Sequence, residues 1–137
     1  MGLVLTVKGF DEEIYDSGYM GFTQFRIAVL SAYDKDLGTI YQKWLKNYIT
    51  DANALTSAEN VKLRTLLKTP WKHLLLHSDC DGKLTPRQCK AIYNLTKDLR
   101  CDYQQANYLD TTGKNLLEVF NRALKFCYEN KVSMNFE

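Results

Sequence analysis

The sequence lacks the short motifs by which most catalytic and nucleotide-binding sites are recognised. It contains no GxSxG, no P-loop, no GxGxxG and no HExxH. No stretch approaches the roughly 20 apolar residues needed to cross a bilayer, and MGLVLTVKGF at the start lacks the basic residues and long apolar run of a secretory signal. We therefore expect a cytoplasmic protein without membrane association, and no motif points to a known enzyme class.

Cysteine pairs of the CxxC type are also missing. The four cysteines are Cys80, Cys89, Cys101 and Cys127, and without an export signal we expect reduced thiols. Cys127 falls on the apolar stripe of a predicted helix, so it should be a small buried core residue. An intramolecular disulfide is the alternative.

What is present is the composition of an ordinary folded protein. The chain has 137 residues, of which 45% are apolar and 25% charged, so we expect one domain spanning 1–137. The net charge of +2 is unevenly distributed, because residues 43–100 alone sum to +6. This basic region could attract nucleic acid or an acidic protein. However, its lysines stand singly between apolar residues, as on solvated helix faces.

The periodicity of apolar residues predicts a mainly α fold with a minor β element. Alternation at Leu3, Leu5 and Val7 predicts an N-terminal strand, and the tail 132–136 could pair with it. Asp16-Ser17-Gly18 reads as a turn. Apolar residues at helical spacing predict about five helices in one compact domain. The segments concerned are 20–34, 37–48, 57–69, 85–99 and 116–127, with a further short helix at 71–76.

Two helix starts are marked by capping boxes. In Thr56-Ser57-Ala58-Glu59 and in Thr85-Pro86-Arg87-Gln88, a hydroxyl and a side-chain carbonyl can satisfy the free N–H groups of the first turn. Pro86 fits the first helical position of the second box. Pro70 should end the preceding helix near Thr69.

The segment before the second box reads HSDCDGKLTPRQ (77–88) and is similar to the calcium loop of an EF-hand. With Gly82 aligned to the invariant glycine, Asp79, Asp81 and Gln88 take three of the positions that supply oxygen ligands. Helices are predicted on both sides, so a helix–EF-hand-like loop–helix unit is expected over about 70–99. The candidate metal ligands are His77, Asp79, Asp81 and Gln88.

Two departures weaken a calcium site. His77 stands where the first Asp belongs, and Gln88 replaces the bidentate Glu, so one negative charge and one donor oxygen are lost. Three alternatives stay open: a metal-free turn held by hydrogen bonds, a weak site for calcium or another divalent cation, and a site for a softer metal. His73, four residues before His77, could join it in binding zinc. We favour the absence of a cofactor.

The segment HSDCDGKLTPRQC (77–89) resembles the signature of small bacterial and phage proteins that carry HSDCDG near the middle. The resemblance extends to GFTQFR (21–26) and LKFC (124–127). It implies a shared fold and no established activity. Members often carry an acid where Gln88 stands, which would place this chain among the poorer metal binders. If the motif is a functional site in that family, His77, Asp79, Cys80 and Asp81 are the corresponding residues here.

Two classes of function fit these observations. The first is a non-catalytic binding or regulatory module, associated with phage or mobile elements, that contacts a protein partner. The second is a small metal-dependent hydrolase that uses His77, Asp79 and Asp81. Cys80 as a nucleophile with His77 as its base is a variant of the second class.

Overall fold

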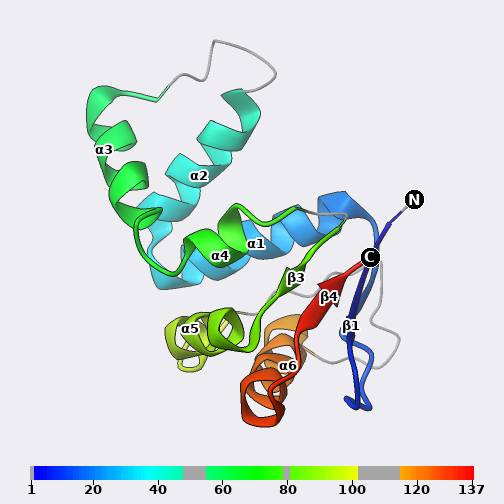
Figure 1. The fold of residues 1–137 in the computed structure, drawn as a ribbon. Coiled ribbons are helices and arrows are strands. Elements are labelled where there is room, and N and C mark those ends of the chain that lie inside the picture. The colour runs from blue at the N-terminus through cyan, green and yellow to red at the C-terminus, as the bar shows by residue number, and fades with distance from the viewer. Residues whose placement is uncertain (1, 48–54, 79–80, 102–114) are drawn as a thin grey trace.

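The computed structural model describes residues 2–47, 55–78, 81–101 and 115–137. Within these ranges it contains six helices and a four-stranded sheet (Figure 1). In chain order the elements are β1 (Leu3–Val7), β2 (Tyr15–Ser17), α1 (Tyr19–Tyr33), α2 (Lys35–Asn47), α3 (Ser57–Leu66), α4 (Lys72–Leu75), β3 (Lys83–Leu84), α5 (Pro86–Thr96), α6 (Leu116–Asn130) and β4 (Met134–Phe136). The predicted mainly α class is confirmed.

The sheet is larger than the minor β element that the sequence suggested. Its strand order is β2-β1-β4-β3, and all neighbours are antiparallel. The predicted pairing of the first strand with the tail is confirmed, with Leu5 opposite Phe136. Two short strands went unpredicted. Asp16 and Ser17, expected in a turn, lie in β2, and β3 lies inside the EF-hand-like segment. Both strands become recognisable only through their partners.

The core lies where α1 and α6 meet the sheet. Apolar residues from distant parts of the chain form one buried cluster, in which aromatic rings are prominent. The ring centroids of Phe22 in α1 and Phe136 in β4 are 5.9 Å apart, and those of Phe25 and Phe120 are 5.4 Å apart, in both cases edge to face. Such pairs add to the stability that burial supplies. Phe136 therefore connects the sheet to the helices.

The first two helices approach each other closely at Gly38. A Cβ at this position would lie 2.0 Å from Oγ and 2.9 Å from Cα of Ser31 in α1. Asp34 between the helices accepts hydrogen bonds from the N–H groups of Asp36 and Leu37 through Oδ1, at 2.9 and 3.2 Å. A glycine at the start of α2 thus permits the tight contact between the two helices.

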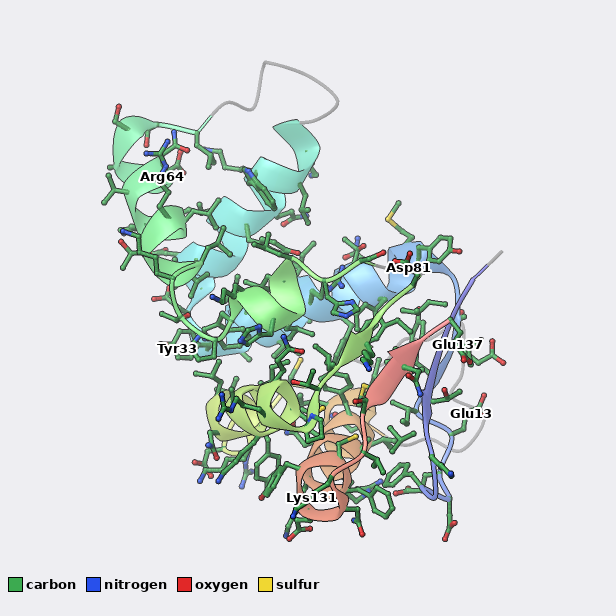
Figure 2. All side chains as sticks on the ribbon, in the orientation of Figure 1. Glu13, Tyr33, Arg64, Asp81, Lys131 and Glu137 are labelled. Atoms are coloured by element: carbon green, nitrogen blue, oxygen red, sulfur yellow. The ribbon has the colours of Figure 1, made fainter. Side chains whose placement is uncertain are left out.

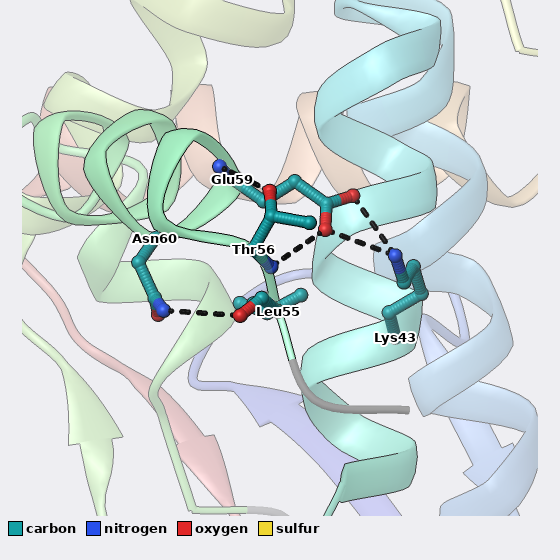
Figure 3. A network of polar contacts seen from close by, with 5 residues as sticks. All are labelled: Lys43, Leu55, Thr56, Glu59 and Asn60. Atoms are coloured by element: carbon teal, nitrogen blue, oxygen red, sulfur yellow. Dashed lines mark hydrogen bonds and ion pairs between the residues drawn. The ribbon is translucent and has the colours of Figure 1, made fainter. Parts of the chain in front are cut away.

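The capping box of α3 also joins this helix to α2. Thr56 Oγ1 accepts from the N–H of Glu59 at 3.2 Å, and the Glu59 carboxylate accepts from the N–H of Thr56 at 3.0 Å. Lys43 of α2 donates to both oxygens of that carboxylate at 2.9 and 3.0 Å (Figure 3). These hydrogen bonds, the one from the Thr56 N–H first, lower the pKa of Glu59.

The hairpin of α2 and α3 extends away from the sheet at the top of the view, whereas α5 and α6 lie at the bottom of the view, beside the sheet (Figure 1). The described parts of the basic region 43–100 belong to α2, α3, α4, β3 and α5, which are distributed over both of these parts of the molecule. None of the helices in the described ranges combines the length and the apolarity that a membrane span requires.

Candidate functional site

The loop that follows α4 turns back to the sheet at Gly82. Gly82 has a φ of +94°, in the left-handed region that favours glycine. Its carbonyl oxygen accepts a hydrogen bond from the N–H of Phe136 at 2.9 Å. Lys83 and Leu84 then pair with β4, and Leu84 is fully buried. The predicted glycine turn is therefore present, and it leads directly into a strand.

The ring of His77 lies against this turn. Its centroid is 3.9 Å from that of Phe136. Nδ1 lies 2.8 Å from the carbonyl oxygen of Ser78, and Nε2 lies 3.1 Å from that of Lys83. A carbonyl oxygen only accepts, so each contact is a hydrogen bond only when that ring nitrogen carries a proton, and a neutral imidazole has one such nitrogen. A metal could bind His77 only if one of these two contacts were given up.

Arg26 holds the start of the loop from α1. Its side chain is 4% exposed, its Nη2 donates to the carbonyl oxygen of His77 at 2.6 Å, and its guanidinium lies 4.7 Å from the centre of the Phe22 ring. A permanent positive charge at this point disfavours a metal cation nearby. The guanidinium also supplies a strong, charge-assisted hydrogen bond to the loop.

The side chains at the end of the loop form the predicted capping box of α5. The N–H of Thr85 donates to Gln88 Oε1 at 2.9 Å, and the N–H of Gln88 donates to Thr85 Oγ1 at 3.2 Å. In the EF-hand alignment the Gln88 oxygen would be a metal ligand. Here the two side-chain oxygens satisfy the free N–H groups of the first helical turn.

Of the predicted metal ligands, His77, Asp81 and Gln88 lie in the described residues, whereas Asp79 and the neighbouring Cys80 lie outside them. Asp81 is exposed at the molecular surface (Figure 2). Over the described ranges, no three His, Cys, Asp or Glu side chains come together as a metal site would require. A metal bound through Asp79 stays a prediction.

The proposed zinc pair of His73 and His77 assumed one continuous helix. The helix α4 ends at Leu75, so His77 lies beyond it and its ring faces β4. Burial lowers the pKa of His73, and the charge of Lys72 adds a smaller effect in the same direction. The i, i+4 geometry behind the zinc hypothesis is therefore not formed.

Cys89 of α5 and Cys127 of α6 lie in the contact between the two helices, and both are fully buried. This confirms the core position predicted for Cys127. A hydrogen bond with Cys127, followed by burial, raises the pKa of Cys89. Among the three described cysteines none forms a disulfide. These thiols fill space in the core.

Sequence reasoning missed Arg26 and Phe136. Arg26 stands four residues after Phe22 and three before Val29, so it occupies the buried stripe of its own helix, and this spacing was the available signal. Phe136 lies 54 residues after Gly82 (136 − 82), and nothing local connects the two.

Comparisons of the chain with protein-family models, with curated proteins and with solved structures give no match. The resemblance built on residues 77–89 accordingly stays a prediction.

Proposed function

We propose that the protein is a non-catalytic binding or regulatory module in which the 77–88 loop serves as a structural brace. The observation that supports this most is the position of His77, with both ring nitrogens at hydrogen-bonding distance from carbonyl oxygens of the same loop. A general base or a metal ligand needs a nitrogen lone pair that faces substrate or metal. Each ring nitrogen of His77 faces one of these carbonyl oxygens, which supports the brace.

The other groups of the loop agree with a brace. Gln88 and Thr85 complete a helix cap, Gly82 bonds to β4, and Arg26 reaches in from α1. The loop thereby joins α1, α5 and the sheet. A module of this kind presents its surface to a partner and needs no resident metal or cofactor.

The metal part of the proposal is tested on purified, untagged protein. Elemental analysis should find no stoichiometric metal, and the melting temperature should be the same with EDTA, with millimolar calcium and with zinc. A bound metal in one-to-one ratio, or a melting temperature that rises with one ion and falls with EDTA, contradicts the brace and favours the metal-dependent hydrolase.

The catalytic part is tested with His77→Ala. Loss of the ring should destabilise the fold by about 1–2 kcal/mol, the range of a lost cap or turn contact. Hydrolase screens with phosphoester, ester and peptide substrates should show no turnover for either protein. An activity that disappears in His77→Ala while the variant remains folded by circular dichroism would overturn the proposal.

A further inference from the structure

The outer face of α3 and the turn after it carries positive charges that nothing in the described part of the chain neutralises. Lys62, Arg64 and Lys68 are exposed, and their side chains form no ion pair or hydrogen bond with a described residue. Glu59 is the acidic residue of α3, and its carboxylate is occupied by Lys43 and by the helix cap. The cationic character of this face is therefore uncompensated.

An apolar centre lies between these cations. Val61 is 64% exposed, and at about 100° per residue it points away from Leu63 and Leu66, the buried residues of α3. Thr65, one turn further, donates its hydroxyl to the carbonyl oxygen of Val61 at 2.8 Å. That bond engages the polar group of Thr65 with the backbone of its own helix. We call Val61, Lys62, Arg64, Thr65 and Lys68 the α3 face.

The residues of the α3 face are exposed, and no described element covers them. The α2–α3 hairpin extends away from the sheet (Figure 1), and Arg64 lies at the opposite end of the molecule from Glu13 and Glu137 (Figure 2). An elongated ligand can approach α3 without contacting Glu13 or Glu137.

We infer that the α3 face binds an acidic amphipathic helix of a partner protein. An apolar centre with a charged rim is the usual anatomy of a protein interface, and helices bind through an apolar stripe flanked by charges that fix partner and orientation. Nucleic acid would contact the cations through its phosphates and would gain little from Val61. The inference rests on the proposed function, because it names the chemistry of the partner of that module.

The test measures binding of a fluorescein-labelled helical peptide, with a leucine stripe flanked by glutamates, to the full chain by fluorescence anisotropy. The double variant Lys62→Glu/Arg64→Glu should bind about tenfold more weakly, or worse, at low salt. Val61→Ser should weaken binding about threefold or more because apolar burial is lost. The matched control Lys8→Glu/Lys125→Glu has the same net charge as the double variant and should stay within about twofold of the wild type. All four changed side chains in the two double variants are exposed.

Several results would overturn the inference. These are failure of the wild type to bind the peptide, equal weakening by both double variants, and a Val61→Ser variant with unchanged affinity. Duplex DNA bound more tightly than the peptide would identify a nucleic-acid surface, and sedimentation showing self-association through α3 would identify a second copy as the occupant. Melting curves of each variant confirm folding. Failure of the proposed function can be distinguished from failure of this inference. The former would appear as bound metal or enzymatic turnover, neither of which depends on the peptide.

Discussion

Replacing Arg26 with Met measures how strongly the guanidinium holds the 77–88 loop. Met keeps most of the apolar stem of the side chain and removes the charge. The lost interactions are the charge-assisted hydrogen bond to the His77 carbonyl at 2.6 Å, about 1.5–3 kcal/mol, and the contact with the Phe22 ring, about 0.5–1 kcal/mol. Part of this is offset because Met carries no charge that has to be desolvated. We expect a net loss of about 2–3 kcal/mol in the free energy of unfolding.

The assay is urea denaturation followed by tryptophan fluorescence and circular dichroism. The midpoint should fall while the slope of the transition stays the same, and the melting temperature should drop by roughly 10 °C for a chain of this length. The matched control is Arg122→Met, which removes an exposed bidentate ion pair with Glu12 and should cost about 1 kcal/mol or less. If the two substitutions have equal effects, or if Arg26→Met is within about 0.5 kcal/mol of the wild type, the guanidinium does not brace the loop.

Three further expectations follow from other parts of the fold. Gly38→Ala places a Cβ against the backbone of α1 and should lower the free energy of unfolding by about 1–3 kcal/mol. A variant more stable than the wild type would show that α1 and α2 can move apart without loss of stability. Burial, aided by the charge of Lys72, lowers the pKa of His73 in the folded protein. The neutral ring therefore contributes to the free energy of unfolding at pH values above the pKa of the unfolded state, near 6.5. This contribution is lost as the pH falls through the pKa of the folded state. The free energy of unfolding should therefore decrease less between pH 7.5 and 5 in His73→Gln than in the wild type. An equal decrease in both proteins would contradict this. Peptide mapping after alkylation should find Cys89 and Cys127 unmodified in the folded protein and modified in urea, because both thiols are buried. Rapid alkylation of either thiol in the folded protein would exclude the packing of α5 against α6 described above.

Local signals were enough to predict most of the helices. The two capping boxes occur as the sequence indicated, because each depends on residues three positions apart. The strand Leu3–Val7 was also predictable, since its alternation directly reflects one buried face. Gly38, in contrast, carries no local signal of this kind. Its role in the close contact with Ser31 depends on the packing of two helices and could not be read locally.

The candidate site was only partly predictable. The turn at Gly82 follows from its neighbours, but the strand after it exists because β4 supplies hydrogen-bond partners from the other end of the chain. The EF-hand comparison gave Gln88 a metal-binding role, whereas the same residue three positions after Thr85 also fits a cap, and the cap is what the structure contains. A pattern shared by two structures cannot distinguish them without the tertiary partners, here Arg26 and Phe136.

The strand order has a consequence for synthesis on the ribosome. β4 lies between β1 and β3 in the sheet, yet it is translated after all the described helices. Until residues 134–136 leave the exit tunnel, β1 and β3 have no common neighbour, and the turn at Gly82 lacks the amide that bonds to its carbonyl oxygen. Because contacts of such long sequence separation form late, we expect nascent chains to acquire helices first. Protection of the 77–88 loop from proteases should appear only once Phe136 has left the exit tunnel.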